Sequence, residues 1–213
     1  MSQSQPESYG LLCQHYQETA LLESTSALLG WDERTNMPAS AGEFRAEQIA
    51  YLSGLIHQRN TDSRLNDWLG ELSESPLAAD PHSDEGATIR QLRRKYEKQS
   101  KLPQTLVEEL SRTAILGQQA WVGARASNDY DSFEPILKKI VDLKRQQAEA
   151  MGYDECPYDA LLDDFEPDAL TSNVAQVLEG LRADLVPLIG AIAESGREPN
   201  LALLQRDYPV AAQ

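Results

Sequence analysis

Apolar side chains recur with a helical period along nearly the whole chain. In residues 9–29 they follow one another at intervals of three and four positions, at Leu12, Tyr16, Thr19, Leu22, Ser26 and Leu29. This spacing places side chains on one face of an α-helix. Leu21 and Leu28 fall on the opposite side, so the pattern predicts a helix that is buried on more than one face. We expect it to end at residues 30–32.

Two more helices are predicted between residues 40 and 73. Ser40 and Glu43 match the S-x-x-E capping box that starts many helices. The stripe of the helix that follows comprises Ile49, Leu52, Ser53 and Ile56. A shorter helix repeats the same spacing at Leu65, Trp68, Leu69 and Leu72.

Turn residues divide the second half of the chain into four further helices. One follows the loop 73–86, and the next has Pro103 in its first turn, where a missing N–H costs little. The buried stripe of that helix is expected at Leu106, Leu110, Ala114 and Trp121. Asp131 and Glu134 can box the start of the sixth helix, and Gly152 can cap its end.

The last predicted helix begins near Thr171, which can cap it. Its apolar face is formed by Val174, Val177, Leu178, Leu181, Leu185, Leu188 and Ile192. Pro187 lies inside this pattern and should kink or break the helix, because proline removes one backbone hydrogen bond.

The helical periods together predict an all-α fold, since no segment shows the sustained alternation of a strand. We expect an antiparallel, bundle-like domain of about seven helices with short loops, covering residues 1–213. The clearest loop, residues 73–86, is rich in Pro, Ser and Asp and could separate two subdomains.

The charge balance bears on partners and location. The chain has 34 acidic and 19 basic residues, a net charge of −15, which argues against a nucleic acid or an anionic membrane surface as its main partner. No apolar run approaches the roughly 18 residues of a membrane span. The polar N-terminus lacks a secretory pattern, so cytoplasm is the expected location. Cys13 and Cys156 lack CxxC spacing and are expected to be free, with a disulfide between them as the alternative.

A basic cluster stands out in this acidic chain. Residues 90–101 contain Arg90, Arg93, Arg94, Lys95, Lys98 and Lys101. Such a cluster is typical of a solvated helix face or of partners for nearby acids, and a recognition patch is the alternative.

Few residues are available for catalysis. His15, His57 and His82 are the three histidines, and they form no H-E-x-x-H or E-x-x-H pattern. The sequence also lacks G-x-S-x-G and the Gly-rich phosphate loops. Cys13 would need a base beside it, and His15, two positions along a helix, points to a different side. We therefore expect His15 to have a core or interface role.

The strongest candidate metal site is an acidic segment. Its seven acids are Asp154, Glu155, Asp159, Asp163, Asp164, Glu166 and Asp168. They could attract Mg²⁺ or Ca²⁺. However, the spacing does not match an EF-hand, and Pro167 stands where a D-D-x-x-D motif needs its third Asp. Capping and backbone hydrogen bonds are the favoured interpretation.

Several segments resemble the carboxypeptidase Taq family of metallocarboxypeptidases. In that family a Trp-Asp-x-x-x-x-Met-Pro stretch precedes a helix that reads R-A-E-Q. The corresponding residues here are Trp31, Asp32, Met37, Pro38 and residues 45–48. "WVGARASNDYDSFEPILKKIVDLKRQQAEAMGY" and "YDALLDDFEP" resemble later family stretches in the same order, so the resemblance covers roughly residues 9–210.

The resemblance implies a helical, zinc- or cobalt-dependent enzyme that removes C-terminal residues from peptides. The family's H-E-x-x-H helix, its further glutamate ligand and its substrate-carboxylate site lie downstream of the matched region. No catalytic, cofactor-binding or metal residue is therefore carried over to this chain. The implied role is the N-terminal helical part, which forms the wall or cover of the substrate groove and is inactive alone.

The same resemblance leaves the partner open. The chain could join a C-terminal catalytic half, or associate with a second copy, or act as a stand-alone binding or regulatory module. A third hypothesis keeps catalysis through the acidic segment and a cation. Trp31 and Asp32 are the residues to probe for a contribution to the groove. We expect Trp31 in the core, and Asp32 either paired with Arg34 or Arg45 or capping the local turn.

Overall fold

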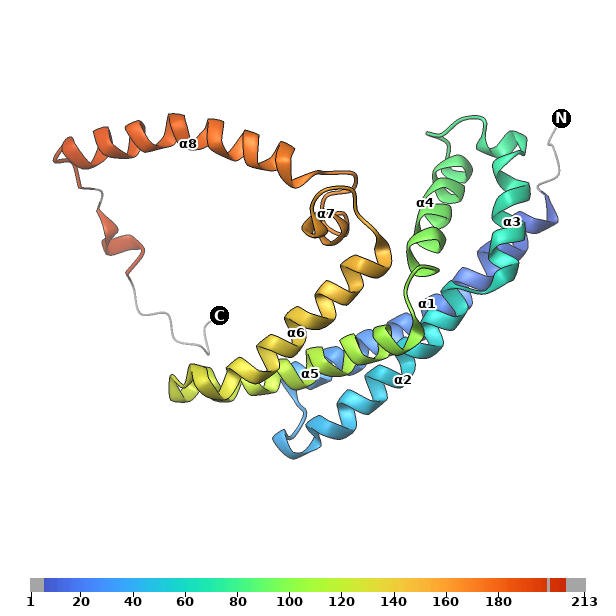
Figure 1. Ribbon diagram of the computed structural model, residues 1–213, viewed down its shortest axis with the longest axis horizontal. Coiled ribbons are helices and arrows are strands. Elements are labelled where there is room, and N and C mark those ends of the chain that lie inside the picture. The colour runs from blue at the N-terminus through green and yellow to red at the C-terminus, as the bar shows by residue number, and fades with distance from the viewer. Residues whose placement is uncertain (1–5, 199, 206–213) are drawn as a thin grey trace. The chain divides into compact units, whose positions relative to one another are not determined.

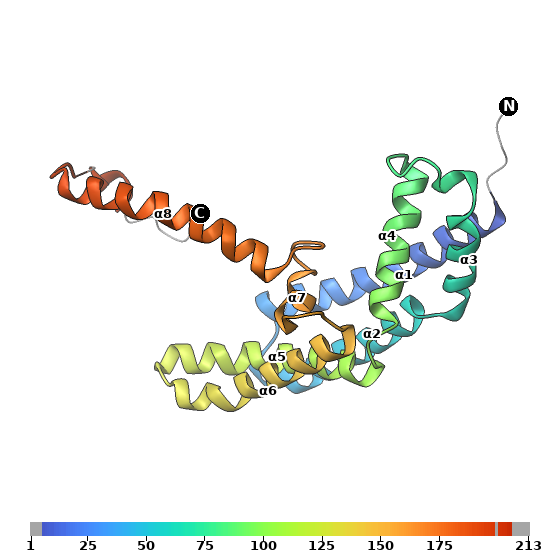
Figure 2. The ribbon, with the colours of Figure 1, turned by 45° about the horizontal axis from the view of Figure 1, so that its top comes forward.

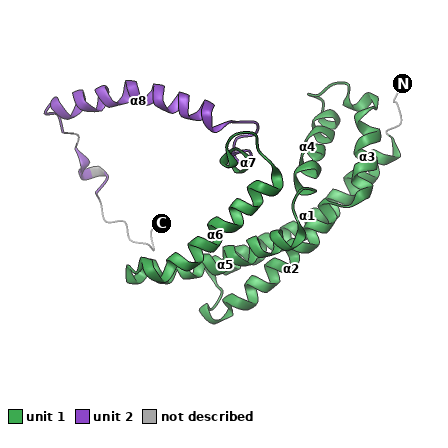
Figure 3. Cartoon of the chain, in the orientation of Figure 1, with its two compact units in different colours: residues 1–161 green, residues 162–213 purple. Residues whose placement is uncertain are grey.

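The computed structural model describes residues 6–198 and 200–205. These residues form eight α-helices and three short 3₁₀-helices, with no strand among them, which confirms the all-α fold with one helix more than expected. The chain divides into two compact units, residues 1–161 and 162–213 (Figure 3). The division therefore falls at the end of the acidic segment's first half, and the loop 73–86 lies inside the first unit.

Four long helices make up most of the first unit. They are α1 (Glu7–Thr35), α2 (Gly42–Asn60), α5 (Gln104–Ser127) and α6 (Tyr130–Met151). Helix α2 packs against both α1 and α5, and α5 packs against α6 (Figures 1 and 2). The central position of α2 and α5 joins segments that are far apart in the sequence.

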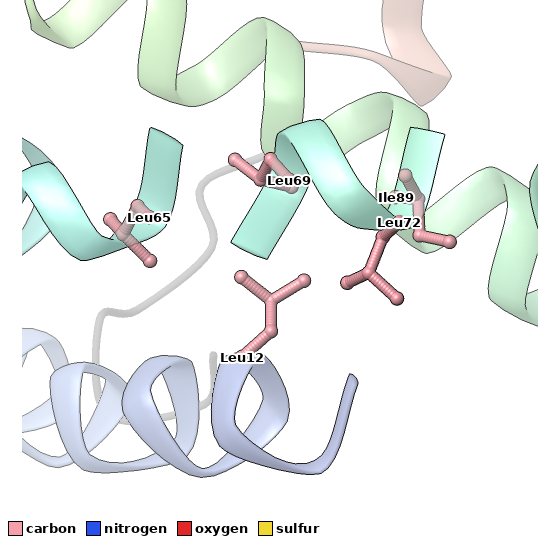
Figure 4. Packing of buried hydrophobic residues seen from close by; sticks show 5 residues of the cluster. All are labelled: Leu12, Leu65, Leu69, Leu72 and Ile89. Atoms are coloured by element: carbon pink, nitrogen blue, oxygen red, sulfur yellow. The ribbon is translucent and has the colours of Figure 1, made fainter. Parts of the chain in front are cut away.

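A second, smaller packing centre lies at the other end of α1. Helices α3 (Ser63–Ser73) and α4 (Asp84–Gln99) form a hairpin joined through the 3₁₀-helix Pro76–Ala78. Figure 4 shows the buried residues at this centre, which come from three helices: Leu12, Leu65, Leu69, Leu72 and Ile89. The stripe predicted for the third helix is thus confirmed. Because α3 and α4 share this core, the loop between them does not separate subdomains.

Helix α1 differs from its prediction at two points. It continues through Gly30 and Trp31 to Thr35, because nothing before Pro38 forbids helical backbone. The side chains of Leu21 and Leu28 are 70% and 62% exposed, so α1 is not buried on a second face in this chain.

Helix caps were predicted with mixed success. Ser40 lies in a 3₁₀-helix, Ala39–Ala41, and α2 has no side-chain cap, so the capping box is wrong. Helix α6 is capped by Asp129, whose Oδ1 accepts from the Ser132 N–H at 3.2 Å. Gly152 caps the other end of α6 at φ +80°, as predicted. Asp129 was missed because several acids crowd the same turn.

The buried side of α5 is lined by small residues. Leu106, Thr113, Gly117 and Ala124 are buried, whereas Ala114 and Trp121 are exposed, which corrects the predicted stripe. A Cβ added at Gly117 would lie 3.0 Å from Ile140 Cδ1 on α6. The small side chains allow α5 to approach α6 closely, so volume and not hydrophobicity selects the buried positions.

The remaining helices are α7 (Pro157–Leu162), in a segment predicted as loop, and α8 (Thr171–Glu194). Leu170, and not Thr171, occupies the N-cap position of α8 and makes no side-chain cap bond. Helix α8 runs unbroken through Pro187, and none of its residues is buried. Among the described residues, no helix is long and apolar enough to cross a membrane.

Candidate functional site

The Trp-Asp and R-A-E-Q segments meet where α1 ends and α2 begins. Arg45 Nη2 on α2 donates to Asp32 Oδ2 at 2.7 Å, and Arg45 Nη1 donates to the Leu29 carbonyl oxygen at 2.6 Å. Arg45 Nε also donates to Gln48 Oε1 at 3.1 Å. One guanidinium thus fixes the end of α1 to α2, and Asp32 pairs with Arg45, one of the alternatives that the sequence offered.

A second charged group continues the link from α2 to α5 and α6. Arg112 donates from Nε and Nη2 to the two carboxylate oxygens of Glu47, at 2.7 and 2.9 Å, and from Nη1 to Glu109 Oε2 at 2.7 Å. Lys139 on α6 also pairs with Glu109. The hydrogen bond from Arg112 lowers the pKa of the Glu47 carboxyl, and the bonds from Lys139 and Arg112 lower that pKa at Glu109. The three helices are therefore joined by ionised groups.

Arg112 and Glu109 were missed by the sequence reasoning. Glu47 and Arg112 are separated by 65 positions, and no local pattern connects them. Together with Asp32 and Arg45 they complete what we call the motif frame: Asp32, Arg45, Glu47, Glu109 and Arg112. Bidentate pairing of an arginine with a carboxylate fixes orientation as well as distance. The motif frame therefore sets the positions of α1, α2 and α5 relative to one another.

Trp31 does not lie in the core of this chain. Its side chain is 58% exposed, which corrects the expectation of burial. The adjoining residues line a hollow of about 340 Å³ between the end of α1, the turn that follows and α5, at Glu33, Arg34, Met37, Ala39, Gln118, Gln119 and Val122. Close approach of α2 explains Gly42 beside this hollow, since a Cβ there would lie 1.9 Å from Gln119 Oε1.

A second hollow, of about 290 Å³, lies where α5 turns into α6. Its lining is largely aromatic, with one arginine: Trp121, Ala124, Arg125, Asn128, Asp129, Tyr130 and Phe133. Asn128 ends α5 in the left-handed conformation at φ +54° and so allows the tight turn. The two hollows can accept apolar side chains, but neither brings together a nucleophile and a base.

The buried histidines are engaged in structural hydrogen bonds. The Nε2 atom of His15 lies 2.8 Å from the Arg59 carbonyl oxygen, while Arg59 Nη2 donates to the His15 carbonyl oxygen at 3.0 Å. The Nδ1 atom of His57 lies 3.4 Å from Gln99 Oε1. The predicted core role of His15 is confirmed, and its ring nitrogen is committed to joining α1 and α2.

The acidic segment serves its own backbone. Asp163 Oδ1 accepts from the Asp168 N–H at 2.9 Å, and this bond supports the left-handed conformation of Asp168 at φ +65°. Across residues 6–198 and 200–205, no group of three or more His, Cys, Asp or Glu side chains could hold a metal ion. The described residues therefore do not fit the zinc or cobalt centre that the family resemblance implies.

The basic cluster of residues 90–101 has internal partners. Lys95 Nζ lies 3.0 Å from Glu23 Oε1 on α1, and Lys101 Nζ donates to the Met151 carbonyl oxygen at 2.9 Å. Arg90 Nη1 donates to the Pro81 carbonyl oxygen at 2.6 Å. These contacts favour the structural interpretation of the cluster over a recognition patch.

Comparison with known proteins identifies relatives over almost the whole chain. Residues 11–213 match the family described as carboxypeptidase Taq (M32) metallopeptidase. Thermostable carboxypeptidase 1 of Thermus thermophilus is 37% identical over 215 residues, which cover 96% of this chain and 42% of the relative. Carboxypeptidase 1 of Bacillus subtilis is 29% identical and is matched over 93% of this chain and 38% of its own length.

The fold agrees with a solved structure. A crystal structure described as BsuCP has a TM-score of 0.87 and 26% sequence identity, over 97% of this chain and 41% of that chain. The chain thus spans about 40% of the length of the proteins that it matches.

Proposed function

Because this chain belongs to the carboxypeptidase Taq (M32) metallopeptidase family, we propose that its helices form a wall or cover of the peptide groove of a metallocarboxypeptidase. The proposed substrate class is peptides, from which such an enzyme removes C-terminal residues. The zinc or cobalt ligands of this activity lie outside the described residues. The proposed contribution of the chain is therefore to position and enclose the substrate, and the chain alone does not catalyse hydrolysis.

The motif frame is the observation that carries this proposal. Asp32, Arg45 and Glu47 belong to segments that resemble the family motif, and each of them is engaged in a bond between helices. Charged groups used in this way are not free to bind metal or to transfer protons. A rigid wall contributes to catalysis by holding a substrate in one geometry, and loss of that geometry lowers the rate. The motif therefore supports a framework role.

Both free cysteines support a reducing compartment. Cys13 and Cys156 are not bridged. Because disulfides persist mainly in oxidising compartments, we propose the cytoplasm as the location.

A peptidase assay tests the proposed function. The purified 213-residue chain is incubated with a peptide panel and Zn²⁺ or Co²⁺, and released C-terminal amino acids are quantified. We expect no release above a blank that contains the metal alone. Joining the chain to the part of the Thermus thermophilus relative that it does not match should yield release that a chelator abolishes. Chelator-sensitive release by the chain alone, surviving repurification, would overturn the proposal.

A further inference from the structure

Helix α8 carries a wide apolar surface. Seven large side chains, which we call the α8 arc, are each between 40% and 70% exposed: Val177, Leu178, Leu181, Leu185, Leu188, Ile189 and Ile192. At about 100° per residue, they fall within about 120° of the helix circumference. Figure 1 shows α8 as one long helix, so the arc forms a continuous strip along it.

Such a strip is the face by which a helix packs on a core. The opposite side of α8 includes the small residues Gly180, Ala183 and Gly190 and the exposed ion pair between Arg182 and Glu179. No residue of α8 is buried. Contiguous apolar surface of this extent on a helix marks an interaction site. The arc therefore requires a partner that presents an apolar face.

The relatives indicate which partner this is. The family match runs through α8 to residue 213, yet only 42% of the Thermus thermophilus relative is matched. The unmatched part of the family fold is thus available to cover α8 in those proteins. A second copy is a poorer occupant, because each copy carries a net charge of −15 and like charges repel.

We propose that the α8 arc is the docking surface for polypeptide corresponding to the part of the family fold that this chain does not match. The proposal rests on the proposed function, since it names the partner that would complete the groove. The contact is apolar and helix-mediated, and it forms equally when the partner is supplied as a separate chain. Association therefore does not depend on the peptidase reaction.

Co-production provides the test. The full 213-residue chain is produced with the unmatched part of the Thermus thermophilus carboxypeptidase, and the mass of the complex is measured by light scattering. We expect a complex of one copy of each, in which backbone hydrogen exchange of residues 171–194 is slower than in the chain alone. Peptide hydrolysis is measured separately on the same sample.

Matched variants locate the contact on the arc. Leu181→Glu combined with Leu185→Glu places two charges in the arc, and Ala183→Glu places a charge on the opposite side of α8. Glutamate is a good helix former, so the helix is retained in both variants. Burial of unpaired charges should weaken the complex about 100-fold or more for the arc variant. Ala183→Glu should change the affinity by less than about threefold.

A fused protein provides a second measurement if the separate partner does not fold. The chain is joined directly to the unmatched Thermus part, and the melting temperature is compared among the variants. The arc variant should melt at a lower temperature than Ala183→Glu. Equal effects of the two variants would overturn the proposal, in either format.

Three other results would overturn the docking surface. They are no complex and no stabilisation in the fusion, exchange of residues 171–194 that is already slow in the chain alone, and a homodimer that the arc variant abolishes. The proposed function fails separately. A complex that forms through the arc but releases no amino acids, with metal present, supports the docking surface and contradicts the peptidase role.

Discussion

Arg45 on α2 holds Asp32 near the end of α1, with 2.7 Å between Nη2 and Oδ2. Residues 36–41, which connect the two helices, are bracketed by this pair. The Trp-Asp and R-A-E-Q segments, which resemble the family motif, therefore have a common structural purpose in this chain. Because the Arg45 side chain is only 13% exposed, the bond is partly shielded from water and contributes more than a surface pair.

Replacing Arg45 tests this purpose. Arg45→Met should lower the free energy of unfolding of the first unit by about 2 kcal/mol, since Asp32 and the Leu29 carbonyl lose a partner. Urea unfolding followed by tryptophan fluorescence reports on this unit, because Trp31, Trp68 and Trp121 all lie within it. In Arg34→Met the lost guanidinium is 78% exposed and 3.9 Å from Glu33, so a change below about 0.5 kcal/mol is expected. Equal losses would contradict the assignment.

Two glycines of α5 provide a matched comparison. Gly123 has no atom within 4 Å of an added Cβ, so Gly123→Ala should stabilise the first unit by about 0.5–1 kcal/mol through helix propensity. Gly117→Ala gains the same propensity but places its Cβ 3.0 Å from Ile140 Cδ1. We expect it to be at least about 1 kcal/mol less stable than Gly123→Ala. Thermal unfolding measures both, and equal melting temperatures would show that α5 and α6 are not closely packed at Gly117.

The buried hydroxyl of Tyr16 predicts an alkaline limit to stability. This oxygen has no hydrogen-bond partner among the described residues, and burial, with Glu23 and Tyr96 nearby, raises the pKa of Tyr16 from 10.0 to about 12. A raised pKa stabilises the fold below pH 10, and this contribution is lost as the pH rises through about 12.

Tyr16→Phe should remove that loss. Near neutral pH the variant is expected within about 1 kcal/mol of the parent, because no hydrogen bond is broken. Above pH 10 it should be the more stable of the two, as measured by urea unfolding across the alkaline range. Tyr51→Phe, at an exposed ring, should leave the alkaline loss in place. If Tyr16→Phe lost stability in parallel with the parent, the buried phenol would not be the cause.

Asp62 predicts an acid limit. Its Oδ1 accepts from the Arg64 N–H at 3.0 Å and caps α3, and hydrogen bonding to the Arg64 side chain lowers its pKa from 3.8 to about 2. A lowered pKa stabilises the fold above pH 3.8, and this contribution is lost as the pH falls through about 2.

Two substitutions separate the cap from the charge. Asp62→Ala should cost about 1 kcal/mol at neutral pH, since the cap is lost. Asp62→Asn should retain the cap and remove the acid loss, so its difference from the parent should shrink as the pH falls from 4 to 2. The measurement is urea unfolding at a series of pH values. A difference that is independent of pH would rule out the ionised carboxylate.

The helical content and the packing of α3 could be predicted from the sequence because both depend on local order. Leu65, Leu69 and Leu72 recur at helical intervals, and any helix formed there must present them together. Gly152 ends α6 for an equally local reason, since glycine reaches positive φ without steric cost. The resemblance of ordered segments to the carboxypeptidase Taq family was confirmed by the match over residues 11–213.

The candidate site was only partly predictable. Asp32 and Arg45 were recognised as potential partners, but Arg112 could not be assigned to Glu47, because 65 positions separate them and no period relates them. The exposure of Trp31 was likewise missed, since an aromatic side chain has the same sequence pattern on a core face and on an open face.

Sequence by itself therefore determined that this chain folds as helices, where most of them lie and to which family it belongs. Only the tertiary structure decided which helix faces meet, which charges pair and which apolar strip, the α8 arc, is left uncovered. The physical reason is that helix formation depends on residues three and four positions apart. Burial and ion pairing depend instead on which distant segments come into contact.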